Sequence, residues 1–153
     1  MNKSEIVAAI LEKLREEFEH FRAVSKRTRS AGNDSESKSE GKYDTRSIEE
    51  NYLADGLAKQ AAASAQAAAA YEGFELNEFT AETPLDLGAL IQVRFPTETT
   101  WFFLGPAGGG IEIPDGNRTL TVITPESPLG KQLIGLKVGD RTTAPKAKIL
   151  AVE

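Results

Sequence analysis

Residues 127–140 read SPLGKQLIGLKVGD, and this stretch decides how the C-terminal part of the chain folds. Ser127 is a helix N-cap residue whose hydroxyl can accept a free backbone N–H, and Pro128 suits the first helical position. An apolar face at helical spacing follows, made of Leu129, Leu133 and Ile134. Gly135 then ends the helix, and the Gly139-Asp140 pair turns the chain toward a final strand. The stretch therefore predicts a short capped helix followed by a strand.

The sequence around this helix alternates apolar and polar residues as half-buried strands do. The predicted strands cover residues 89–95, 100–104, 119–124 and 148–152. With the short helix they predict a small antiparallel sheet packed on one helix, and therefore an α+β domain over residues 76–153. Between two of the strands, residues 105–110 read GPAGGG without the Lys-Ser/Thr of a P-loop, so they predict a turn rather than a phosphate site.

The N-terminal half has helical periodicity instead. From Lys3 to about Arg29 the apolar residues recur every three or four positions, with Ser4 as the expected cap. Residues 30–43 are small and polar and cannot supply a core, so they predict a solvated loop. The first half of the chain is thus expected to begin with one long amphipathic helix and a tip loop at about residues 30–43.

A second helix is predicted from Asp44 or Thr45 to about Tyr71. Its expected buried stripe is Leu53, Leu57, Ala61, Ala65, Ala68 and Tyr71. Gly56 lies inside it, at a cost of roughly 1 kcal/mol relative to alanine. Two such helices joined by one polar loop predict an antiparallel coiled-coil hairpin over residues 1–75, and a helix of this length projects roughly 40 Å.

Composition excludes several kinds of function. The chain has 153 residues, with 18 basic and 23 acidic side chains and a net charge of −5, so the overall charge gives no sign of a protein that holds nucleic acid by its phosphates. The absence of cysteine excludes disulfides, thiolate zinc sites and cysteine nucleophiles. The N-terminal residues are interleaved with charges, unlike a signal peptide or membrane span. We expect a cytoplasmic protein with a protein partner.

Two stretches together resemble the bacterial GreA/GreB family of transcription elongation factors. Residues 127–140 are similar to the closing segment of that family, and residues 42–60, KYDTRSIEENYLADGLAKQ, are similar to the acidic, tyrosine-containing start of its second coiled-coil helix. The resemblance implies an FKBP-like fold for the C-terminal domain. It also implies RNA polymerase core enzyme as partner, with the hairpin inserted into the polymerase secondary channel. The expected polymerase-contacting residues are Ser127, Pro128, Leu129 and Gly130.

The resemblance also implies that acidic tip residues help the polymerase hold a catalytic Mg²⁺, so that a backtracked transcript is cleaved. A hard dication of this kind needs only one or two carboxylates besides water and phosphate. Asp44 best matches the family's tip aspartate and Glu40 is the second candidate, although Asp44 can also serve as a helix N-cap. Ile48 occupies the place, four residues before Tyr52, where a second acid is expected.

This interpretation leaves several alternatives. The protein would be no enzyme itself, would bind no cofactor or metal stably on its own, would act as a monomer, and would meet nucleic acid only within the transcription complex. It would either stimulate cleavage or occupy the channel without cleavage. One rival is a peptidyl-prolyl isomerase or chaperone, which rests on the expected fold alone. The other is a coiled-coil adaptor for a different partner.

Overall fold

The structure, a computed structural model, describes residues 1–38 and 44–153, without the side chains of residues 31–38 and 44–46. It divides into two compact units, one made of Lys13–Gln66 and the other of Met1–Glu12 with Ala67–Glu153. The units divide within the two long helices, and the domain boundary between residues 75 and 76 stays a prediction. The first turns of the chain belong to the second unit because, for example, the Lys3 ammonium donates to the backbone carbonyl of Asn77.

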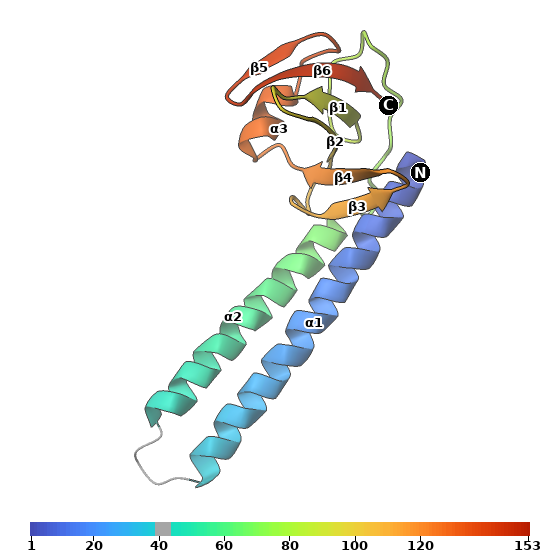
Figure 1. Cartoon of the computed structure of the whole chain (residues 1–153). Helices are drawn as coiled ribbons and strands as arrows, with labels where there is room; N and C mark the ends of the chain where they lie inside the picture. The colour runs from blue at the N-terminus through green and yellow to red at the C-terminus, as the bar shows by residue number, and fades with distance from the viewer. Residues whose placement is uncertain (39–43) are drawn as a thin grey trace. The chain divides into compact units, whose positions relative to one another are not determined.

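The helical unit is an antiparallel pair, formed by the parts of α1 (Lys3–Lys38) and α2 (Asp44–Ala69) within it (Figure 1). Its cross-helix hydrogen bonds show that the two helices run in opposite directions. Glu17 faces Ser64, whose hydroxyl donates to it at 3.4 Å, and farther along α1 the Ser25 hydroxyl donates to the Ala54 carbonyl at 2.6 Å. The predicted hairpin arrangement of the two helices is confirmed for this unit.

The first helix is longer than its sequence suggests. It continues past Arg29 to Lys38, so the loop prediction is wrong for residues 30–38, while residues 39–43 lie outside the described part. The polar composition of this stretch removes any apolar face, but no proline interrupts it. Each residue added to an existing helix adds one backbone hydrogen bond, so a helix that is already formed can extend through a polar segment.

The buried face of α2 differs from the predicted stripe. Its buried positions within the unit are Ser47, Ala54, Ala61 and Ser64, whereas Leu53 is 57% exposed. The buried positions are separated by seven, seven and three residues, the repeat that keeps a helix face turned toward a partner helix. Of the predicted stripe, Ala61 is buried and Leu57 is half-buried within the unit, so the stripe is right in part. The seam therefore holds alanine and serine, and the larger apolar side chain of Leu53 points outward.

The second unit contains one six-stranded sheet in the order β3-β4-β2-β1-β6-β5. The strands are β1 Leu90–Arg94, β2 Thr99–Leu104, β3 Glu112–Asp115, β4 Arg118–Ile123, β5 Arg141–Thr143 and β6 Lys146–Val152. Every neighbouring pair is antiparallel except β2 and β4, so the antiparallel sheet predicted from the sequence contains one parallel pair. The β3 and β5 strands were not predicted because both are short edge strands with little alternation.

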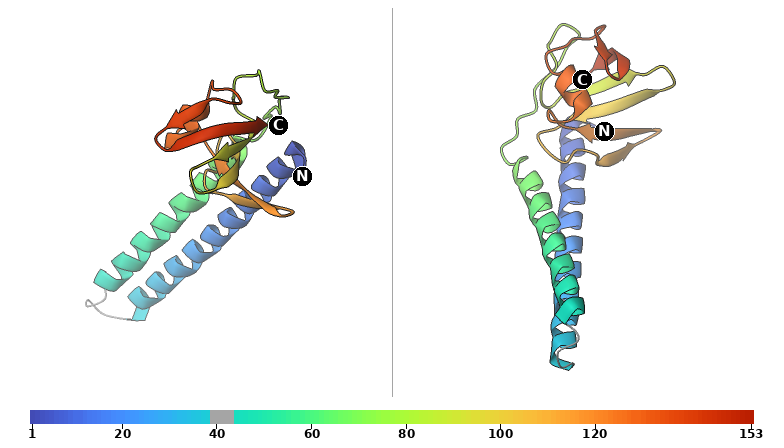
Figure 2. Two further views of the ribbon diagram at one scale, coloured as in Figure 1. Left: turned by 45° about the horizontal axis from the view of Figure 1, so that its top comes forward. Right: turned by 90° about the vertical axis from the view of Figure 1, so that its left-hand side faces the viewer.

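A short helix, α3 (Pro128–Leu133), packs against the core of this sheet (Figures 1 and 2). Leu133 is fully buried there, in a cluster of buried aliphatic residues that includes Ile91, Leu104 and Ile149. One sheet with one helix in this unit, together with the two long helices, confirms the α+β class. The sheet also fixes which side chains of β1, β5 and β6 face away from the core.

Candidate functional site

The start of α3 has the capping geometry that the sequence predicts. The Ser127 hydroxyl oxygen accepts a hydrogen bond from the Gly130 backbone N–H at 3.0 Å, and the same hydroxyl donates to the Thr124 carbonyl at 2.8 Å. Pro128 occupies the first turn, where no backbone donor is needed. The N-cap prediction for Ser127 is therefore confirmed, and its hydroxyl is occupied by contacts within the protein.

Gly130 is required for the same local packing. It is buried, and a Cβ at this position would lie 1.9 Å from the Thr124 carbonyl oxygen, far inside van der Waals contact. The neighbouring Leu129 is half-buried and packs on the sheet core. Among the four expected polymerase-contacting residues, Ser127, Leu129 and Gly130 thus hold α3 in place, and Pro128 is exposed. A contact between these residues and polymerase stays a prediction.

One residue that the sequence predicted on the apolar face of the helix lies on the outer surface beside α3. Ile134 was expected on the apolar face with Leu133, but it lies just past the end of the helix and is 40% exposed. Its backbone leaves the helical region at φ −56° and ψ 129° while its N–H donates to the Gly130 carbonyl. With exposed Pro128 and Lys131, it makes a mixed apolar and basic surface, which we call the α3 surface.

Gln132 links α3 to the turn between β5 and β6. Its side-chain nitrogen donates to the Ala144 carbonyl at 2.5 Å, and its side-chain oxygen accepts from the backbone N–H groups of Thr143 at 3.0 Å and Ala144 at 3.3 Å. Because one side chain binds both donors and acceptors of the turn, it holds the β5–β6 hairpin against the helix. Sequence reasoning did not identify this role, since nothing local to Gln132 indicates its partner.

The acidic tip residues are described only in part. Glu40 lies outside the described residues, and Asp44 is the first residue of α2 with a side chain that is not described. The next turns of α2 carry exposed apolar side chains: Ile48 is 49% exposed and Tyr52 is 72% exposed. The position where the family resemblance expects a second acid therefore presents an isoleucine to solvent.

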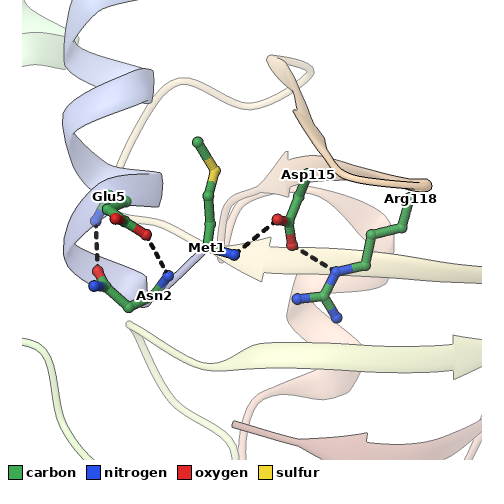
Figure 3. A network of polar contacts seen from close by, with 5 residues as sticks. All are labelled: Met1, Asn2, Glu5, Asp115 and Arg118. Atoms are coloured by element: carbon green, nitrogen blue, oxygen red, sulfur yellow. Dashed lines mark hydrogen bonds and ion pairs between the residues drawn. The ribbon is translucent and has the colours of Figure 1, made fainter.

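A polar network joins the first residues of the chain to the β3–β4 hairpin (Figure 3). The Met1 ammonium donates to Asp115 at 2.8 Å, and the Arg118 guanidinium donates to the other oxygen of the same carboxylate at 2.7 Å. These hydrogen bonds, that of the ammonium first and that of Arg118 second, hold the pKa of Asp115 below its usual value. The network is a structural clamp within the unit.

The same region corrects the expected cap of the first helix. The Asn2 side chain accepts from the Glu5 backbone N–H at 2.9 Å, and the Glu5 carboxylate accepts from the Asn2 backbone N–H at 2.8 Å (Figure 3). This reciprocal pair is a capping box with asparagine in place of Ser or Thr. Asn2, and not Ser4, therefore caps α1.

The glycine-rich stretch 105–110 is a turn between β2 and β3, as its sequence predicts. The Tyr71 hydroxyl donates to the Ala107 carbonyl at 2.7 Å, and burial raises the pKa of this tyrosine. A Cβ on Gly105 would lie 2.3 Å from the same hydroxyl. One glycine of this stretch therefore makes room for the tyrosine.

The described part of the chain has neither a metal-binding cluster nor a membrane-spanning helix. Residues 1–38 and 44–153 contain no group of three or more histidine, cysteine, aspartate or glutamate residues that could hold a metal ion. Within the same ranges, no helix has the length and apolar composition needed to cross a membrane.

No protein-family model matches the chain, and no curated protein matches it. Solved structures of GreA factor homolog 1 (Gfh1) are similar to it. The Thermus thermophilus protein is 17% identical, with 97% of this chain and 93% of that chain covered and a TM-score of 0.36. A structure of the transcription factor Gfh1 is 19% identical over 94% of this chain and 92% of that chain, with a TM-score of 0.35. The Thermus aquaticus Gfh1 structure is 19% identical, with 93% of this chain and 92% of that chain covered and a TM-score of 0.34.

Proposed function

We propose that this protein is a transcription factor of the GreA/GreB type that binds RNA polymerase core enzyme and enters its secondary channel. The observation that carries the proposal is the stretch at residues 127–140, which resembles that family and folds into a capped helix built by Ser127 and Gly130. A second observation supports it independently, because the same chain forms an antiparallel helical pair in Lys13–Gln66. Together they match the two parts that a channel-entering factor needs.

The sheet unit supplies the anchor in this proposal. The α3 surface of Pro128, Lys131 and Ile134 is its contact, since it combines an exposed large apolar side chain with a basic one beside the family-like stretch. Ser127 and Gly130 act indirectly by fixing the backbone that presents it. The hairpin then carries its tip toward the polymerase active site, and the protein itself turns over no substrate.

Asp44 and Glu40 are the tip acids that would assist the polymerase Mg²⁺. A carboxylate brought next to that ion can help position a metal that stabilises the attacking and leaving oxygens during transcript hydrolysis. The Mg²⁺ belongs to the polymerase, and the protein contributes only oxygen ligands. Such a factor is a monomer in the cytoplasm and requires no cofactor of its own.

One observation favours a second form of this function, in which the protein occupies the channel without promoting cleavage. Ile48 is exposed at the place where the family resemblance expects a second acid, and an alkyl side chain cannot ligate a metal or accept a proton. With a single aligned carboxylate the tip could still fill the channel and exclude other factors. The two forms share the anchor and differ only at the tip.

The anchor is tested by a surface variant of the full chain. The double variant Lys131→Gln/Ile134→Ser removes one charge and one apolar side chain from the α3 surface and leaves the N-cap residue Ser127 unchanged. Lys137→Gln/Pro84→Ser removes one positive charge and one apolar side chain at two exposed positions of the same unit outside the α3 surface. Fluorescence anisotropy of the labelled protein with purified core polymerase should show weaker binding for the first variant alone. Equal affinities of both variants and the parent would place the anchor elsewhere.

A further inference from the structure

A basic hollow of about 610 Å³ lies where β1, β5 and β6 meet in the sheet unit. Four of its lining residues are cations, and no lining residue in this fully described region is acidic: they are Arg94, Arg141, Lys146 and Lys148. Phe95 also lines it. The volume is in the range of ordinary ligand pockets. Nothing in the proposed polymerase anchor uses this surface, because the anchor lies at α3.

The strand register places three of these cations in one row. Arg94 of β1 pairs with Lys148 of β6, and Lys148 pairs with Arg141 of β5. Paired residues of neighbouring strands point to the same face, and the buried residues Val93 and Ile149 occupy the other face. The fourth cation, Lys146, is two residues from Lys148 along β6 and so shares its face.

A row of this kind is unfavourable unless an anion accompanies it. Like charges directly opposite each other on neighbouring strands destabilise a sheet. Across residues 1–38 and 44–153, none of the four cations forms a salt bridge with a described carboxylate. Arg94, Arg141 and Lys146 are exposed, and Lys148 is half-buried. Their concentration in a protein with a net charge of −5 indicates a site for an external anion.

The spacing indicates what kind of anion fits. Adjacent strands are about 4.8 Å apart, so the row of three cations spans roughly 10 Å, and Lys146 lies about 6.6 Å from Lys148 along the strand. One carboxylate or one phosphate would have to draw four long side chains to a single point, whereas successive phosphates of a chain can each meet a different cation. Arginine suits phosphate because its planar guanidinium binds two oxygens at once.

The spacing of the cations favours a nucleic-acid chain over a compact anion. Phe95 is half-buried, packs on the buried cluster and lies edge-to-face against Phe102, with ring centroids 6.2 Å apart, so its ring belongs to the core. A positively charged groove that follows the backbone is the arrangement that proteins use for single strands, with successive phosphates on successive cations. We propose that this basic face binds the backbone of single-stranded nucleic acid.

This proposal revises one expectation from the sequence. The excess of acidic residues predicts no general affinity for nucleic acid, and the present site is local: it would contact about two or three phosphates. Binding should therefore be weak and strongly dependent on salt, with log K falling against log salt at a slope of about −1.4 to −2 for a single strand. It also requires no polymerase, so it can fail or succeed independently of the proposed function.

The test is fluorescence anisotropy of the full chain with a fluorescein-labelled twelve-nucleotide oligo(U) in 50 mM KCl. The double variant Arg141→Gln/Lys148→Gln should bind about tenfold more weakly, because it removes two of the phosphate contacts. Lys59→Gln/Lys137→Gln is the control, since it removes the same charge from exposed lysines outside the hollow and should bind as the parent does. Circular dichroism checks folding, and Lys146→Gln supplies a milder variant of the same site.

Competition against the labelled oligo(U) shows which class of anion the hollow prefers. Unlabelled oligo(U) should displace the probe, whereas poly-glutamate of equal charge and tripolyphosphate of equal phosphate concentration should displace it poorly. No binding by the parent, or an equal loss in the control variant, would overturn the proposal. Displacement by poly-glutamate would replace it with an acidic protein segment, and displacement by tripolyphosphate would replace it with a compact phosphate ligand.

Discussion

The Thr124 carbonyl oxygen and Gly130 approach each other so closely that a Cβ on Gly130 would lie 1.9 Å from that oxygen. The contact is to backbone, which cannot move aside as a flexible side chain can. It also lies at the first turn of α3, where the Ser127 hydroxyl joins the same carbonyl to the helix. This contact explains the glycine of the SPLG stretch by packing alone.

Gly130→Ala should therefore destabilise the sheet unit. Overpacking a tight site costs about 1–3 kcal/mol, and here the added methyl meets backbone, so the loss should lie at the upper end. Urea unfolding followed by tryptophan fluorescence reports on this unit because Trp101 lies in β2. An unchanged midpoint would show that the turn at Thr124 can shift at little cost.

Gly56→Ala serves as the opposite case. Gly56 lies inside α2, has no positive φ, and has no heavy atom within 4 Å of the place a Cβ would occupy. Alanine should raise the helix stability by roughly 0.5–1 kcal/mol through its better helix propensity. Thermal melting followed by far-ultraviolet circular dichroism measures the change, and a loss of stability would mean that this surface is covered.

The difference between these two glycines illustrates what the sequence reveals. The cap at Ser127 is local, so its hydroxyl, proline and glycine identify it without knowledge of the fold. The buried seam of α2 was predicted only in part, at Ala61, because the small side chains of Ala54 and Ser64 give a weak apolar signal or none, and only the partner helix shows which face is covered. Likewise, the parallel pairing of β2 with β4 depends on contacts between distant segments.

The candidate site residues also differ in whether the sequence alone reveals them. A tip rich in acids is visible in the sequence at Glu40 and Asp44. The basic row is not, because Arg94 and Arg141 are far apart along the chain and are brought together only by the order β1-β6-β5. Net charge averages over such a cluster and conceals it.

The clamp at Asp115 should give a defined pH dependence. Because the Met1 ammonium and Arg118 hold its pKa below the ordinary value of 3.8, its contribution to stability is fully present above that value. The contribution is lost as pH falls through the lower pKa of the folded state. The melting temperature of Asp115→Asn should thus fall below that of the parent at pH 6, with the difference shrinking below pH 3.8.

The control for this experiment is Glu112→Gln, which neutralises an exposed carboxylate on the same strand outside the clamp. Its melting temperature should match that of the parent at pH 6. If the melting temperatures of the parent and Asp115→Asn differ by the same amount at pH 6 and well below pH 3.8, the clamp does not depend on the charge of Asp115.

Asp44→Asn separates two roles of the first residue of α2. Asparagine retains the size and capping ability of aspartate but lacks the negative charge that Mg²⁺ needs. If Asp44 assists the metal, the variant should bind polymerase normally while Mg²⁺-dependent cleavage of a backtracked transcript falls. Glu49→Gln, an exposed acid one turn farther along, is the matched control. Equal cleavage by parent and Asp44→Asn would leave the aspartate with a capping role.

The central claim is that this protein binds core RNA polymerase in its secondary channel. The direct measurement is anisotropy of the labelled full chain titrated with purified bacterial core enzyme, followed by competition with unlabelled GreA. The account predicts saturable binding that GreA reverses, with retention of most of the affinity after residues 30–43 are deleted, because the anchor lies in the sheet unit. Absence of binding, or binding that excess GreA leaves unchanged, would contradict it.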